Sequence, residues 1–186
     1  MKRCLIISII FVSALILAFT FLNTGCNLME TMSAEELKAS IEIVDVQTKW
    51  VLKYYQPWPP KLILVPAISF RVKNVTEKSL RYINFIANFR FKDDYENLGD
   101  CYLAAIRKEP VRPGELSKVI TLKSNYGVEG KSLNTFKDNP AWKITVVNLF
   151  AQSKGSQPVK LGQWEISRKI DFKEPEPVGM EKKEKK

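Results

Sequence analysis

The amino-acid sequence predicts an all-β domain, an antiparallel β-sandwich of about seven strands, placed after an apolar N-terminal segment. Three observations favour this fold class: apolar and polar residues alternate in several segments, turn-forming residues separate those segments, and helical patterns are short. Short strands joined by turns, with almost no helix, bury their apolar faces by stacking one sheet on another.

The first 25 residues have the organisation of an export signal. Two basic residues open the chain, residues 5–22 are almost wholly apolar, and small or polar residues follow. The segment ends at Gly25-Cys26, which resembles the lipobox of bacterial lipoprotein precursors, where a peptidase cuts before a cysteine that carries lipid. The resemblance implies a signal peptide at residues 1–25, lipidation of Cys26 and a mature protein held to a membrane through its lipid anchor.

Two alternatives remain for this segment. Residues 5–22 could stay as an uncleaved anchor helix, because at about 1.5 Å per residue they would span roughly 27 Å, nearly a bilayer core. Ordinary cleavage of a secreted protein is the other alternative. Lipid anchor and uncleaved helix both place the chain after residue 30 outside the cytoplasm. Asn27 is not the aspartate that retains enteric lipoproteins at the inner membrane, so the lipobox resemblance favours the outer membrane, facing the periplasm.

Composition limits the partners of the mature chain. Without residues 1–25 it has 27 Lys and Arg against 20 Asp and Glu, a net charge of +7 instead of the +9 of the whole chain. Outside the cytoplasm such a charge favours anionic head groups or acidic polymers, and no nucleic-acid motif is present. Cys101 would have no partner cysteine, which excludes a disulfide framework and predicts a buried structural thiol.

The first folded elements are expected directly after the anchor. Residues 26–40 are predicted to form a tether that ends in a short helix, because Ser33 and Glu36 have the spacing of a capping box. Residues 41–55 are rich in β-branched and aromatic side chains and predict a strand. Three prolines within residues 57–60 then fix an extended segment outside any ladder.

The clearest strand pattern lies in two segments that we expect to form a hairpin. Residues 68–73 and 83–92 alternate apolar and polar side chains with a period of two, and the polar residues 74–79 predict the turn between them. Antiparallel pairing of Phe70 with Ile83 would turn all the apolar side chains to the core. The same pairing would gather four basic side chains on one outer face: Arg71, Lys73, Arg90 and Lys92.

The rest of the predicted sandwich domain, residues 41–172, follows by the same reasoning. Further strands are expected at residues 100–108, 116–123, 142–152 and 162–172, with turns near residues 110–114 and 154–158. Residues 124–139 predict either a functional loop or a short helix that bridges the two sheets. Residues 173–186 contain mostly Lys, Glu and Pro and predict a disordered charged tail.

Part of this pattern is similar to the FxLYD-type immunoglobulin-like domains of bacterial envelope proteins. The similarity is carried by residues 68–76, Leu80, residues 85–91 and the turn Val111-Arg112-Pro113-Gly114-Glu115. In that family a strand ending in asparagine meets a strand about a dozen residues later, and a Pro-Gly-Glu turn precedes another strand. The resemblance covers about 60 of the 186 residues. It implies an immunoglobulin-like fold and gives no information about activity.

The sequence offers no recognisable catalytic or metal-binding pattern. The chain contains no histidine, no glycine-rich phosphate loop and no paired cysteines with metal-ligand spacing, so we expect neither enzyme activity nor a cofactor. Asp93-Asp94-Tyr95-Glu96 could offer oxygen ligands, but it lacks the spacing of a calcium loop and predicts a hairpin tip. Asn74-Val75-Thr76 matches a glycosylation triplet, and in a bacterial lipoprotein Asn74 is expected to shape a turn.

Two surfaces remain as candidates for binding. Trp58, Tyr54 and Tyr55 lie close to Trp50 and the prolines, and such rigid aromatic side chains anchor protein interfaces. Alternatively, Trp50 and one tyrosine fill the core while Trp58 caps an open end. The basic face is the second surface, and it could simply be a solvated sheet face.

These features predict a structural or protein-interaction module of the bacterial cell envelope, which binds an envelope protein through the aromatic residues. The alternative function is an envelope binding protein that carries a small or lipid-like ligand in the β-sandwich. An apolar cavity would favour the ligand carrier. A filled core beside exposed aromatic residues would favour a protein partner.

Overall fold

A computed structural model of the protein describes residues 32–94, 96–137, 139–140 and 142–175. The chain divides into two compact units, and all described residues belong to the second, Met32–Lys186. The predicted signal peptide, Cys26 and the tail from residue 176 therefore lie outside the described residues. In the described part, no helix is both long and apolar enough to cross a membrane.

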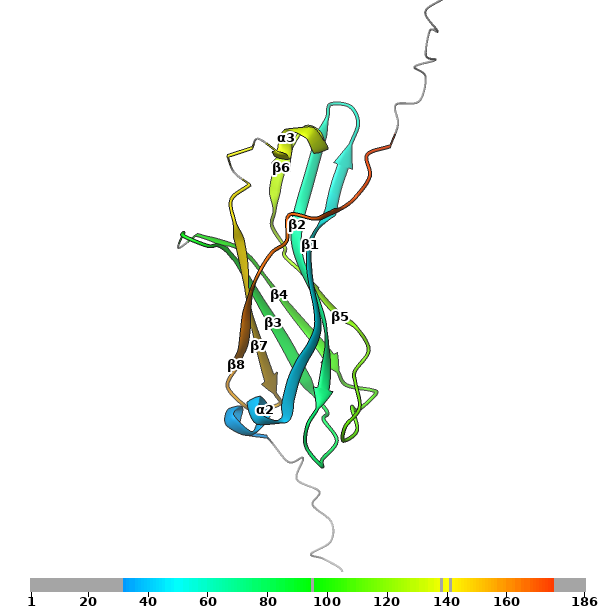
Figure 1. Cartoon of the computed structure of the whole chain (residues 1–186), viewed down its shortest axis with the longest axis vertical. Helices are drawn as coiled ribbons and strands as arrows, with labels where there is room; N and C mark the ends of the chain where they lie inside the picture. Colours follow the sequence, from blue (N-terminus) through cyan, green and yellow to red (C-terminus); the bar gives the residue numbers. More distant parts are fainter. Residues whose placement is uncertain (1–31, 95, 138, 141, 176–186) are drawn as a thin grey trace, which may run out of the picture. The chain divides into compact units, whose positions relative to one another are not determined.

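The described residues form two sheets of mainly antiparallel strands that face each other, with two short helices (Figure 1). This confirms the predicted all-β sandwich. The elements are α2 (Ala34–Ser40), β1 (Ile41–Gln56), β2 (Lys61–Asn74), β3 (Ile83–Phe91), β4 (Asn97–Ile106), β5 (Ile120–Lys123), β6 (Val128–Gly130), α3 (Leu133–Lys137), β7 (Thr145–Ser153), β8 (Val159–Glu165) and β9 (Ile170–Asp171).

The two sheets divide the strands in an order that differs from the chain order. The first sheet has the order β5-β2-β1-β9, and β6 also pairs with β2. The second sheet has the order β4-β3-β7-β8. Antiparallel pairing holds throughout except between β1 and β9, which run parallel.

The predicted hairpin between residues 68–73 and 83–92 is wrong. Strand β2 pairs with β1 and β5, whereas β3 pairs with β4 and β7 in the other sheet. The rings of Phe70 and Phe85 instead meet across the core, with centroids 5.2 Å apart and planes at 71°. Alternation identifies the buried face of a strand and says nothing about its neighbour, so the predicted inward residues are correct while their pairing is not.

Asn74 stabilises the segment in which the chain passes from β2 of the first sheet to β3 of the second. Its buried side chain donates Nδ2 to the carbonyls of Lys78 (2.7 Å) and Val111 (2.9 Å), and its Oδ1 accepts from Thr76 N (3.0 Å) and Oγ1 (2.8 Å). Its backbone also bonds Gly114 N and Glu115 O. Asn74 therefore shapes a turn, as expected, and joins that turn to the Pro-Gly turn.

Helix α2 closes one end of the sandwich. Ser33 Oγ accepts from Glu36 N (3.2 Å) and Glu36 Oε2 accepts from Ser33 N (2.8 Å), which confirms the predicted capping box. These bonds hold the pKa of Glu36 below its ordinary value, chiefly through the Ser33 backbone amide. Leu37 is fully buried and Met32 O accepts from Ser153 Oγ (2.7 Å), so α2 packs on the domain instead of belonging to a free tether.

Several element boundaries differ from expectation. Residues 162–172 form the separate strands β8 and β9, because the chain turns between Glu165 and Ile170 to reach the other sheet. Residues 124–139 contain β6 and the short helix α3, in agreement with the helical alternative. In β7 the odd-numbered residues face the core, which places Val146 and Phe150 on the outer side. Cys101 is only partly buried.

Aromatic and aliphatic side chains from both sheets fill one continuous core. Trp50 packs edge-to-face on Trp142 at 5.8 Å between ring centroids, and Trp142 packs in the same way on Phe136 at 6.0 Å. Burial of such rings supplies most of the favourable free energy of a sandwich. The largest fully buried side chains are Trp50, Phe70, Phe85, Phe89, Phe136, Leu37, Leu62, Leu64, Ile68, Leu80, Ile83 and Leu122.

Candidate interaction surface at the hairpin tip

Strands β1 and β2 form a long hairpin whose tip carries the candidate residues. The pairing runs from Ile41 opposite Asn74 to Gln56 opposite Lys61, with residues 57–60 as the connecting turn. At about 3.3 Å per residue, the 16 residues of β1 extend roughly 50 Å. The hairpin tip therefore lies at the end of this unit opposite to α2 (Figure 1).

Trp58 and Tyr54 are the exposed aromatic side chains of the tip. Trp58 is 85% exposed and Tyr54 is 43% exposed. The side chain of Gln56 links them, because its Oε1 accepts from the Tyr54 hydroxyl and its Nε2 donates to Trp58 O (3.0 Å). Two of the three predicted binding residues thus share one polar bridge and are both accessible.

Tyr55 lies on the opposite face of the hairpin from Tyr54. Adjacent residues of a strand point to opposite faces, and an irregularity in β1 between Leu52 and Tyr54 decides which of the two tyrosines faces inward: Tyr54 pairs with outward Ile63 and Tyr55 with buried Leu62. The Tyr55 ring packs on Phe172 with centroids 5.5 Å apart.

This arrangement agrees in part with the alternative in which the aromatic residues serve the core. Trp50 and one tyrosine, Tyr55, are used in packing. Trp58 caps nothing, because most of its side chain is exposed to solvent.

Tyr126 is an exposed aromatic residue that sequence reasoning missed. It follows β5 and is 70% exposed. Lys53 reaches it from β1: its Nζ bonds Asn125 O and lies 5.6 Å from the centre of the Tyr126 ring. The neighbouring Gly127 marks this loop, because a Cβ there would collide with Leu64 O and a glycine is needed for the loop to approach β2.

The predicted basic face does not form. Arg71 and Lys73 lie on the outer side of the first sheet, and Arg90 and Lys92 belong to the second sheet or its end. Exposed ion pairs also engage several of these cations, since Lys73 pairs with Glu42 (3.4 Å) and Lys92 with Glu165 (3.5 Å). The correction follows directly from the wrong hairpin, because a shared face required β2 and β3 to be neighbours.

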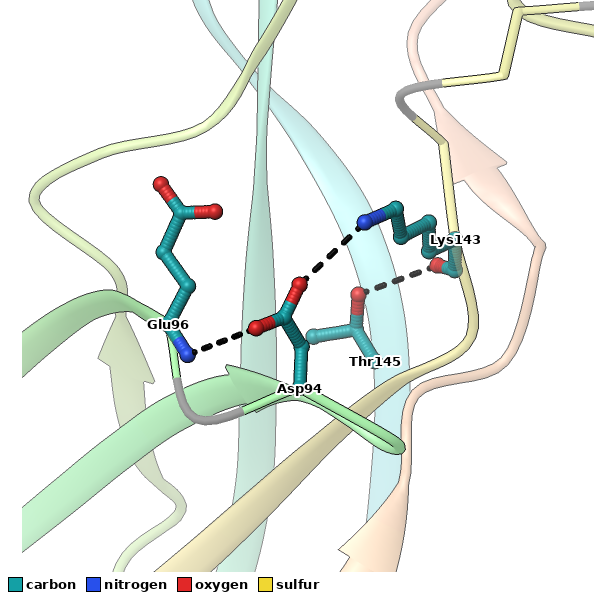
Figure 2. A network of polar contacts seen from close by, with 4 residues as sticks. All are labelled: Asp94, Glu96, Lys143 and Thr145. Atoms are coloured by element: carbon teal, nitrogen blue, oxygen red, sulfur yellow. Dashed lines mark hydrogen bonds and ion pairs between the residues drawn. The ribbon is translucent and has the colours of Figure 1, made fainter.

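The acidic tip between β3 and β4 has a structural role in the described residues. Asp94 Oδ1 accepts from Glu96 N (3.1 Å) and Oδ2 pairs with Lys143 Nζ (3.2 Å), as Figure 2 shows. Thr145 Oγ1 donates to Lys143 O (3.2 Å), which ties this lysine to the start of β7. In the described part of the chain, no group of His, Cys, Asp and Glu could hold a metal ion.

A groove lies at the open edge of the sandwich, outside the core. It has a volume of about 690 Å³ and runs between the free edge of β4 and the segment that leads into β5. Leu103, Leu116 and Val119 are its exposed apolar side chains. The groove is not a site between the two sheets, which is one of the two places that the ligand-carrier alternative allows, the other being an open end of the sandwich.

A scan against models of known protein families finds no match, and a search of curated proteins finds no significant match. The candidate surface therefore rests on the geometry of its own residues. The described geometry brings Trp58, Tyr54 and Tyr126 to the surface and assigns Tyr55 to packing.

Proposed function

We propose that this protein is a lipid-anchored module of the bacterial cell envelope that binds another envelope protein through the tip of its β1–β2 hairpin. The observation that carries the proposal is the high exposure of Trp58 on a long paired hairpin. Exposed tryptophans on rigid elements are the residue type that most often dominates protein interfaces. The proposal includes an immunoglobulin-like fold of FxLYD type.

Tethering at Cys26 would suit a binding tip at the far end of the domain. Five residues separate Cys26 from Met32, after which the chain enters α2. Lipid at Cys26 would hold the α2 end near the membrane and leave Trp58 directed toward the periplasm. Two or more acyl chains are needed for stable anchoring, which the lipoprotein type of modification supplies.

The tip is suited to a protein partner because side-chain contacts hold its turn in one conformation. Gln56 fixes the turn through its two hydrogen bonds, and Lys61 pairs with Glu129 of β6 (3.0 Å) at the base of the tip. Little conformational entropy is then lost when Trp58 becomes buried in an interface. The packed rings of the core favour this function over transport of a ligand between the sheets.

Site-specific crosslinking in cells tests the proposal. A photoreactive phenylalanine analogue in place of Trp58 should give a discrete crosslinked species, whereas the same analogue at Val75, an exposed residue of the opposite end, should give none. Binding of the captured partner in extract should survive 1 M salt, where the screening length falls to about 3 Å, because apolar burial is not screened.

Trp58→Ala should weaken that binding at least about tenfold, while Arg90→Glu should leave it unchanged. A partner that is lost in high salt and unaffected by Trp58→Ala would show that the hairpin tip is not the binding surface.

A further inference from the structure

Strand β4 is an edge strand with one open side. It pairs with β3 on its other side, and within the described residues no ladder, isolated bridge or backbone–backbone hydrogen bond joins it to any further strand. The backbone N–H and C=O groups on the open side of such a strand are a template on which another extended chain can pair.

The core side of β4 is incompletely covered next to this open edge. Leu103 pairs with Phe85, and directly opposed residues of two strands point to the same face of the sheet, so Leu103 points to the core side. Phe85 is fully buried, yet Leu103 is 37% exposed. Cys101, two residues earlier on the same side of β4, is likewise only partly buried. The apolar layer of the second sheet is therefore complete at β3 and accessible at β4.

The groove of about 690 Å³ lies at this uncovered position. Residues 103–106 of β4 form one wall, and residues 115–121, which lead into β5 of the first sheet, form the other. Leu116 and Val119 of this second wall are 47% and 57% exposed. An extended chain laid in the groove would pair its backbone with β4 and remove these apolar side chains from water.

The charges at one end of the groove favour an acidic residue in its occupant. Arg107 and Lys108 directly follow β4 and are exposed, and neither forms an ion pair in the described part of the chain. The two acids of the lining are already engaged, because Glu109 pairs with Lys118 (2.7 Å) and Oε2 of Glu115 accepts from a backbone amide (3.2 Å). Two neighbouring cations without a local counter-charge attract a carboxylate.

We propose that this groove binds an extended segment of another protein, which adds a strand to the free edge of β4. The segment runs antiparallel to β4, as neighbouring strands do throughout this sheet. Alternate apolar side chains of the segment contact Leu103 and Val119. An acidic residue at its N-terminal end lies beside Arg107 and Lys108.

The open backbone edge favours a peptide over a lipid-like ligand. A lipid would contact the apolar walls of the groove, but an acyl chain has no alternating donors and acceptors that could pair with β4. The proposal does not rest on the lipid anchor or on the hairpin tip, which belongs to the other sheet. Failure of one proposal therefore leaves the other intact.

Binding of a synthetic peptide to the full chain in detergent tests the proposal. The probe is acetyl-Glu-Thr-Val-Thr-Val-Thr-Val-amide, and the matched control peptide has Lys in place of Glu. Calorimetry should give a Kd below about 1 mM for the Glu peptide and at least about tenfold weaker binding for the Lys peptide. No binding of the Glu peptide, or equal affinity for the two peptides, would overturn the proposal.

Reversal of the two cations checks the assigned role of their charge. In the double variant Arg107→Glu and Lys108→Glu, the Lys peptide should bind at least about tenfold more tightly than the Glu peptide. The melting temperature should stay close to that of the wild type, because both side chains are exposed. An unchanged preference for the Glu peptide would show that these cations do not recognise the occupant, which contradicts the proposal.

A charge on the apolar wall locates the bound peptide. Val119→Glu should weaken binding of the Glu peptide at least about tenfold, whereas Ile144→Glu, at an exposed residue outside the groove, should leave it unchanged. Trp58→Ala should also leave it unchanged, which separates this site from the hairpin tip. Losses in either control as large as that in Val119→Glu would show that the peptide binds elsewhere.

Hydrogen exchange distinguishes strand addition from other occupants of the edge. The Glu peptide should slow exchange of the backbone amides that residues 103–106 direct to the open side, and it should leave β8, the opposite edge of the same sheet, unaffected. Binding without this protection would overturn strand addition. Protection that is present without peptide would overturn the proposal too, since it would assign the edge to a second copy if it falls on dilution, and to a segment of this chain if it persists.

Discussion

At the scale of single residues, burial and hydrogen bonding separate the structural from the available side chains. Asn74 makes four side-chain hydrogen bonds in a fully buried position. Its replacement therefore weakens the folded state, whereas in the unfolded chain the partner groups bond to water. Trp58, by contrast, is 85% exposed. The sequence predicted the turn role of Asn74 but could not predict its bond to Val111, which depends on a contact between distant segments.

Asn74→Ala should lower the free energy of unfolding by about 3 kcal/mol or more, because it removes all four side-chain hydrogen bonds of a fully buried residue. Chemical denaturation monitored by fluorescence measures this loss. Asn84→Ala, on an outer sheet face, is the control and should change stability by less than about 0.5 kcal/mol. Equal effects of the two variants would contradict the role assigned to Asn74.

Phe89→Ala should cost about 3–5 kcal/mol, because it removes a fully buried ring from the core. Its neighbour Arg90 points to the outer face, and Arg90→Ala should cost less than about 1 kcal/mol. Urea unfolding of both variants checks the assignment. A cost for Arg90→Ala as large as that for Phe89→Ala would mean that the faces of β3 are reversed.

At the scale of elements, the sequence predicted correctly those structures whose stabilising contacts join residues close together in the chain. The capping box of α2 is a contact over three residues, and its sequence signature is therefore complete. The pairing of β2 was predicted wrongly because β1 and β3 both adjoin it in the chain and both carry apolar residues that need burial. Either strand was therefore a possible partner. The choice of β1 depends on its length and on the Asn74 crossing, which no short window contains.

The capping box predicts a pH dependence. Because the hydrogen bonds lower the pKa of Glu36 in the folded state, its carboxylate stabilises the fold above the pH at which glutamate ionises in the unfolded chain. This contribution declines as the pH falls through the lowered pKa. The difference in melting temperature between the wild type and Glu36→Gln should therefore be largest at neutral pH and shrink below about pH 5. A difference that stays constant with pH would contradict the role of the charge.

The long hairpin is the element that sequence reasoning described least well. Three prolines were expected to exclude residues 57–60 from a ladder, and they do form the turn, yet the flanking strands pair up to Gln56 and Lys61. The irregularity near Lys53 then changes which side of β1 faces inward, so that Tyr55 and not Tyr54 packs on the domain. A bulge of this kind leaves no clear trace in a strand sequence, so the division of the aromatic residues into exposed and packed ones required the structure.

At the scale of the whole molecule, the described unit has two distinct ends and two distinct outer faces. Its α2 end continues toward Cys26 along the chain, and its opposite end carries Trp58. The fold class followed from the sequence because alternation and turns determine it. Trp58 and Tyr54 of the candidate site were also predicted, whereas their position at the tip of a long β1–β2 hairpin was not, because it depends on which strands pair.

Mass spectrometry of the N-terminal peptide, from the protein purified out of bacterial membranes, tests the central claim of lipid anchoring most directly. The account predicts that Cys26 is the first residue of the mature chain and carries acyl groups, and that Cys26→Ser leaves an unprocessed precursor. A wild-type chain that keeps residues 1–25, or a Cys26→Ser variant recovered at the mature mass, would contradict it.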